Sequence, residues 1–162
     1  MINYITHILL IVTLLICVYQ DLKNRLVHVF VLISILALSL FQNYKLAWGW
    51  TEPLKSVLFL ISVLTVGFVI HSIIKKKPLK DFYKYFGLGD LVFLFAVIPL
   101  FSYLNYGIFV ISGIIFSILI HYAFYLIHKT KEIPLVGYLS IYLTGLLVYA
   151  FVNPSFLKID VL

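Results

Sequence analysis

The stretch NYITHILLIVTLLICVYQD, residues 3–21, decides the class of this protein. Residues 3–20 contain no acidic residue, Lys or Arg, and the first carboxylate of the chain, Asp21, follows them directly. A run of roughly 18 or more apolar residues is typical of a helix that crosses a bilayer. We therefore predict a membrane helix over residues 3–20, with a carboxylate at its end.

Five more apolar runs follow, separated by polar residues, at roughly 26–42, 54–74, 89–104, 107–128 and 133–152. The chain is 64% hydrophobic and 11% charged, whereas about a quarter of the residues of a soluble domain are charged. Backbone groups in hydrocarbon must be hydrogen-bonded internally, which favours helices. The sequence predicts an all-α, polytopic membrane bundle of about six transmembrane helices, in one domain over residues 1–162. Pro99 should kink the fourth helix.

The net charge of +6 is better explained by orientation in a membrane than by nucleic-acid binding. In the six-helix topology, three of the 12 Lys and Arg residues fall on one side and nine on the other. The positive-inside rule places the larger group in the cytoplasm and both termini outside, as in a multi-pass protein of the inner (cytoplasmic) membrane. The larger group consists of Lys23, Arg25, Lys75, Lys76, Lys77, Lys80, Lys84, Lys129 and Lys131. We expect Lys75 to Lys77 to contact anionic lipid headgroups.

Several kinds of site are excluded or disfavoured. Cys17 is the only cysteine, so the chain has neither an internal disulfide nor a cysteine-based zinc site. His121 and His128 share a helical face but lie about 10 Å apart along the axis, too far for one ion. We expect no metal and no cofactor, and the sequence leaves the oligomeric state open.

Two carboxylates stand apart from the other four, because each adjoins the end of an apolar run. Asp21 ends the first predicted helix, and Asp90 in FGLGDLVFLF, residues 86–95, begins the fourth. Counting membrane crossings places both at the cytoplasmic boundary. If the first and fourth helices pack together, the two side chains can face each other.

A carboxylate near hydrocarbon is costly unless it is paired, protonated or hydrated, and is therefore a functional candidate. Two carboxyl groups that share a site disfavour each other's charge, so one keeps a proton while the other ionises. Such a pair supplies a general base that activates water and a general acid that protonates the substrate. Asp21 and Asp90 are thus candidate catalytic residues for peptide hydrolysis without a covalent intermediate.

Gly87 and Gly89 come just before Asp90. Glycine permits unusual backbone angles and leaves no side chain in the way of an extended substrate strand. We treat both as candidate substrate-binding residues. The alternative is a turn that needs glycine for its geometry alone.

The segments YQDLKNRLV and FGLGDLVFL resemble the two aspartate motifs of the type IV prepilin peptidases, which are G-x-G-D aspartyl proteases of the membrane. The stretch KEIPLVGYLSIYLTG, residues 131–145, resembles the entry to the last helix of that family. The resemblance covers most of the chain. It implies that Asp21 and Asp90 form the catalytic pair and that Gly87 and Gly89 are the motif glycines. The implied substrates are prepilin-like membrane proteins, whose basic leader peptides are removed at the cytoplasmic face.

The chain also departs from the family pattern. Val92 stands where bacterial members commonly have lysine, and residues 26–28 read Leu-Val-His where they often have Ile-Pro-Asn. With one cysteine and no N-terminal extension, the chain resembles the short, peptidase-only form. If the leader is basic, Asp81 and Glu132 are the loop acids available to receive it. Two rival functions stay open: a small transporter that uses the same two aspartates to bind cations or relay protons, and an inactive membrane scaffold.

Overall fold

The computed structural model describes residues 2–46, 50–75, 87–128 and 133–152. Across these ranges all regular secondary structure is helical, which confirms the predicted all-α fold. The elements are α1 (Ile2–Asn24), α2 (Val29–Leu46), α3 (Thr51–Lys75), α4 (Leu88–Val97), the 3₁₀ helix η2 (Ile98–Leu100), α5 (Tyr103–His128) and α6 (Leu135–Val152).

The helices are those of a membrane protein. Three are long and apolar enough to cross a bilayer: α1 over Ile5–Asn24, α3 over Thr51–Ile70 and α5 over Tyr103–Ala123. The others contain shorter apolar segments, Val29–Asn43, Leu88–Leu100 and Leu135–Ala150. The predicted order of six apolar helices is confirmed, with boundaries shifted by a few residues.

The fourth helix differs from its prediction over residues 89–104. Helix α4 ends at Val97, η2 follows, and α5 already begins at Tyr103. Pro99 lies at the start of η2, where its missing N–H and its ring cannot continue the α-helical hydrogen bonds. The result is a break rather than a kink. The 10 residues of α4 span about 15 Å at 1.5 Å per residue, half of the roughly 30 Å hydrocarbon core.

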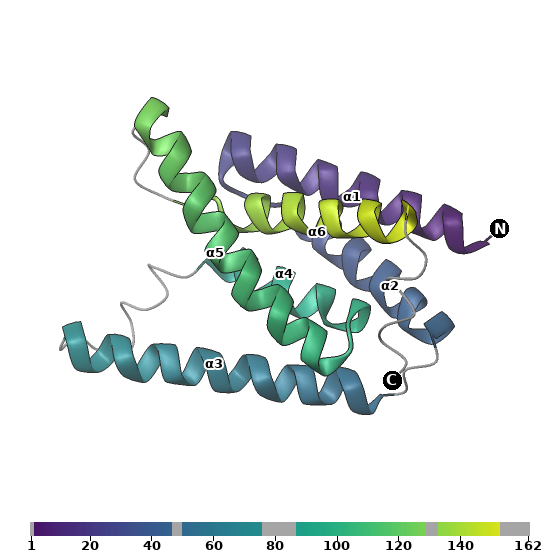
Figure 1. The fold of residues 1–162 in the computed structure, drawn as a ribbon, viewed down its shortest axis with the longest axis horizontal. Helices are drawn as coiled ribbons and strands as arrows, with labels where there is room; N and C mark the ends of the chain where they lie inside the picture. Colours follow the sequence, from purple (N-terminus) through teal and green to yellow (C-terminus); the bar gives the residue numbers. More distant parts are fainter. Residues whose placement is uncertain (1, 47–49, 76–86, 129–132, 153–162) are drawn as a thin grey trace.

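Figure 1 shows how the helices pack: α1 and α6 lie side by side, and α5 crosses α6. Helix α2 packs against both α1 and α4, while α3 runs along one edge and contacts α5 and η2. In the part of the chain that the structure describes, α1 and α4 have no extensive contact with each other. The condition considered from the sequence, direct packing of the first helix on the fourth, is therefore not met; α2 and α6 each contact both helices instead.

Asp21 is the last residue on the buried face of α1. Leu10, Leu14, Cys17 and Asp21 are all buried, and their spacing of four, three and four places them on one helical face. The same face packs against α6, where Val136, Leu139 and Leu143 are buried. The apolar packing of α1 on α6 therefore directs the Asp21 carboxyl toward the beginning of α6.

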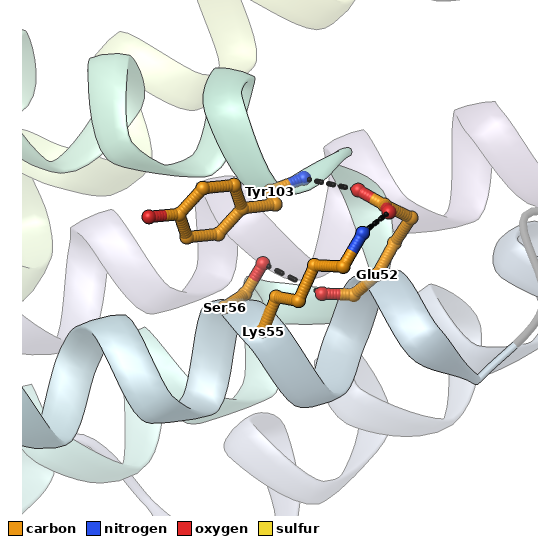
Figure 2. A network of polar contacts seen from close by, with 4 residues as sticks. All are labelled: Glu52, Lys55, Ser56 and Tyr103. Atoms are coloured by element: carbon orange, nitrogen blue, oxygen red, sulfur yellow. Dashed lines mark hydrogen bonds and ion pairs between the residues drawn. The ribbon is translucent and has the colours of Figure 1, made fainter.

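A polar network links α3 to α5 (Figure 2). Glu52 Oε2 accepts the backbone N–H of Tyr103 at 3.0 Å, and Glu52 Oε1 accepts a hydrogen bond from Lys55 Nζ at 2.7 Å. Ser56 Oγ donates to the Glu52 carbonyl at 3.1 Å. The amide of Tyr103 is one of the first in α5, which have no acceptor within their own helix. Glu52 thus caps α5 from the start of α3.

Candidate active site

Asp21 contacts the backbone of α6. The Gly137 N–H donates to Asp21 Oδ2 at 2.6 Å, a buried hydrogen bond between residues 116 positions apart. The first helical hydrogen bond of α6 runs from the Tyr138 N–H to the Pro134 carbonyl at 3.1 Å. Leu135, Val136 and Gly137 are therefore the first three residues of the helix, and their N–H groups have no acceptor within it. The Asp21 carboxyl supplies one.

The start of α6 is also favourable for negative charge. The aligned peptide dipoles leave a partial positive charge at a helix N-terminus, which attracts carboxylates. Glycine at position 137 makes the approach of Asp21 possible, because a Cβ there would lie 3.1 Å from Asp21 Oδ2 and 3.4 Å from its Cβ. The contact with Oδ2 is tighter than nine in ten real Cβ contacts, whereas the contact with the Asp21 Cβ is at van der Waals distance. This position therefore needs glycine for close approach.

Asp90 lies in the first turn of α4, on the same side as the buried residues Phe93, Leu94 and Val97. Its Oδ2 accepts the backbone N–H of Gly87 at 3.1 Å, and its own N–H donates to the Gly87 carbonyl at 3.1 Å. Gly87 has no side chain to complete a reciprocal capping box. The capping contact fixes the Asp90 side chain at the beginning of α4.

Both aspartates lie near the first turn of α6, Asp21 through a hydrogen bond and Asp90 through its electrostatic surroundings. The Asp90 carboxyl interacts with the backbone of Val136, the neighbour of the residue that binds Asp21. The charge of Asp21 also acts on Asp90. The structure therefore brings together the two side chains that the sequence singled out. It does so through two successive residues of a third helix rather than by direct packing of α1 on α4.

The two motif glycines differ from each other. Gly87 has φ −66° and ψ 140°, ordinary extended angles that any residue adopts, and Gly89 has no positive φ either. The expectation of unusual backbone angles is wrong for both. A Cβ on Gly87 would lie 3.1 Å from Asp90 Oδ2, whereas a Cβ on Gly89 would meet nothing within 4 Å. Gly87 thus gives room to the Asp90 carboxyl, and Gly89 borders open space.

Three further residues at this site were not singled out from the sequence. Gly137 was noted only within a longer resembling stretch, and Arg25 only as a cytoplasmic cation. The charges of Arg25 and Asp21 both act on the Tyr138 hydroxyl, and Arg25 also acts on the Asp21 carboxyl. Tyr138 could have been identified from the sequence only because it directly follows Gly137.

Other predicted features fall outside the described ranges or give no site. Asp81, Glu132, Lys76 and Lys77 lie outside the residues that the structure describes, and so does the side chain of Lys75. Among the described side chains, no group of three or more His, Cys, Asp or Glu residues could hold a metal ion. No protein-family model, curated protein or solved structure matches the chain.

Proposed function

We propose that this protein is a membrane aspartyl endopeptidase that removes basic leader peptides from prepilin-like substrates, with Asp21 and Asp90 as its catalytic pair. The observation that carries the proposal is the buried hydrogen bond of Asp21 to Gly137 in the first turn of α6, next to Val136, which together with Asp21 acts on the Asp90 carboxyl. The resemblance of both aspartate motifs to the type IV prepilin peptidases points to the same reaction. The positive-inside rule supports a site at the cytoplasmic face of the inner membrane.

The chemistry follows from a shared proton. The ionised carboxyl of the pair takes a proton from a water molecule, whose oxygen attacks the scissile carbonyl carbon. The protonated carboxyl donates its proton toward the substrate, and the carbon–nitrogen bond breaks as the amine leaves with a proton. Substrate backbone has space next to Gly89, where no described atom outside its own stretch of helix lies within 4 Å of the Cβ position.

The test uses the full chain, purified in detergent or reconstituted in lipid, with a synthetic substrate that joins a basic leader to an apolar helix. Mass spectrometry should find one cut between the two parts. Asp21→Asn and Asp90→Asn should each abolish the cut. Glu52→Gln is the matched control, because Glu52 is an acid that caps α5 and makes no described contact with either aspartate. Cleavage that survives in either Asn variant would refute the proposal.

A scaffold role is the second candidate, and a specific observation favours it. Both carboxyls cap helices, Asp21 through the Gly137 N–H and Asp90 through the Gly87 N–H. Asparagine also caps helix N-termini well, so the Asn variants keep the caps and lose only the acid–base chemistry. A scaffold therefore predicts a folded protein that cuts no leader, with or without the Asn substitutions. The remaining rival, a transporter, predicts proton or cation flux in liposomes without cleavage.

A further inference from the structure

Arg25 has a backbone conformation that its residue type disfavours. It follows the last residue of α1 with φ 54°, the single positive φ found for a non-glycine residue within the described ranges. Its N–H donates to the Asp21 carbonyl at 3.0 Å, the hydrogen bond of a left-handed helix C-cap. Glycine is the usual residue at such a position because it has no Cβ to clash. Strained residues of this kind persist where the surroundings require them, often at functional sites.

The side chain offers a reason for arginine at this position. Arg25 is half-buried, and its charge acts on two groups at the junction of α1 and α6, the Asp21 carboxyl and the Tyr138 hydroxyl. The backbone turn at Arg25 is itself hydrogen-bonded to Asp21. One residue therefore contacts the main chain of Asp21 and supplies positive charge near its side chain.

We infer that Arg25 is a positioning residue, whose guanidinium holds the Asp21 carboxyl against the Gly137 N–H. Among the residues that the structure describes, the ionisable groups that act on Asp21 or respond to it come from three helices or their ends: Cys17 and Arg25 from α1, Asp90 from α4 and Tyr138 from α6. Arg25 is the cation among them. It offsets the negative charge of two carboxyls that share one site, which keeps Asp21 close to the helix start. The effect on cleavage rests on the proposed function, whereas the position of the carboxyl does not.

Arg25→Gly separates this role from a purely structural one. Glycine suits the left-handed backbone better than arginine, so a structural role predicts equal or higher thermal stability and unchanged cleavage. A positioning role predicts equal or higher stability together with a loss of cleavage of about tenfold or more, since small misplacements of a catalytic group are costly. Arg25→Lys keeps a positive charge and should restore cleavage to within a few-fold of wild type.

A second measurement reports the Asp21 position without any substrate. Protein labelled with ¹³C-carbonyl valine and ¹⁵N-glycine gives carbonyl-filtered amide signals only for Val-Gly pairs, which occur at Val66–Gly67 and Val136–Gly137. The new glycine at position 25 follows Asn24 and stays silent. The short bond to a carboxyl oxygen should shift the Gly137 amide proton downfield, and Asp21→Ala gives its position without that partner. Gly67, with nothing within 4 Å of its Cβ position, is the internal reference.

We expect the Gly137 signal of Arg25→Gly to move toward its position in Asp21→Ala, and that of Arg25→Lys to stay near wild type. A Gly137 signal unchanged in Arg25→Gly would overturn the inference, whatever the cleavage result. Failure of the wild-type protein to cleave any leader would refute the proposed function. The Gly137 signal would still show whether Arg25 positions the Asp21 carboxyl.

Discussion

Gly137 donates its backbone N–H to the carboxyl of Asp21 at 2.6 Å, which joins the end of α1 to the beginning of α6 across 116 positions of the chain. The backbone of the neighbouring residue, Val136, acts electrostatically on the Asp90 carboxyl at the start of α4. Helix α6 therefore determines the relative position of the two carboxyls. Changes to its first turn should alter cleavage even though no acid is removed.

Gly137→Ala should lower leader cleavage by about tenfold or more, because displacement of a catalytic group by a fraction of an ångström is costly. The added Cβ would lie 3.1 Å from Asp21 Oδ2 and push the carboxyl away from the helix. Alanine is a better helix former than glycine by up to about 1 kcal/mol, so stability should not explain a loss. The measurement is the initial rate with the synthetic substrate. Gly145→Ala in the same helix is the control, since its Cβ would meet nothing within 4 Å, and an equal loss in both variants would contradict the prediction.

Gly87→Ala and Gly89→Ala should affect different kinetic constants. The Cβ at Gly87 would press on Asp90 Oδ2 and should lower kcat by disturbing the acid–base pair. The Cβ at Gly89 would project into open space and should raise KM by obstructing the substrate strand. Steady-state kinetics of both variants separate the two effects. If Gly89→Ala leaves KM unchanged, Gly89 has no part in substrate binding.

The stability of aspartate variants should depend on the capping hydrogen bonds. Asp21→Ala removes the acceptor of the Gly137 N–H and should cost about 0.5–2 kcal/mol of stability, the usual cost of losing an N-terminal cap. Asp21→Asn retains an acceptor and should unfold near the wild-type temperature. Thermal unfolding in detergent, followed by circular dichroism, compares them. Equal melting temperatures for the two variants would show that the hydrogen bond contributes nothing to the fold.

Leader cleavage should depend on pH in a bell-shaped manner. At low pH both carboxyls are protonated and no base is present, whereas at high pH both are ionised and no acid is present. The rate therefore has a maximum between the two titrations of the pair. Initial rates across the pH range in one lipid composition give the profile. Glu52→Gln should leave it unchanged, and a rate that rises or falls monotonically over the whole range would argue against a shared proton.

The helices could be predicted from the sequence because their apolar runs are long. The spacing of Leu10, Leu14, Cys17 and Asp21 already places the carboxyl on a buried face once the partner helix is known. The break after α4 was harder to predict. Proline in a membrane helix more often bends it than ends it, and the early start of α5 at Tyr103 depends on its cap from Glu52 in another helix.

The candidate site was only partly predictable, because it too depends on contacts between helices that are distant in the sequence. Asp21 and Asp90 could be found because charge is rare beside apolar runs. The role of α6 could not, because its contributions are backbone N–H groups that any residue except proline possesses. Tertiary packing alone decides which of these groups meets a carboxyl. The left-handed conformation of Arg25 was equally hidden, since arginine gives no local signal for it.

At Gly87 and Gly137 an aspartate oxygen lies 3.1 Å from the point where a β-carbon would be. At each of these positions only a hydrogen atom fits beside the carboxyl oxygen without a shift of its neighbour. In a saturation library we expect larger residues to be tolerated less often at these two positions than at Gly67 and Gly145, where a Cβ would meet no described atom of another element within 4 Å. Methods that look for function among reactive side chains would overlook both positions, although each glycine makes room for one of the two carboxyls.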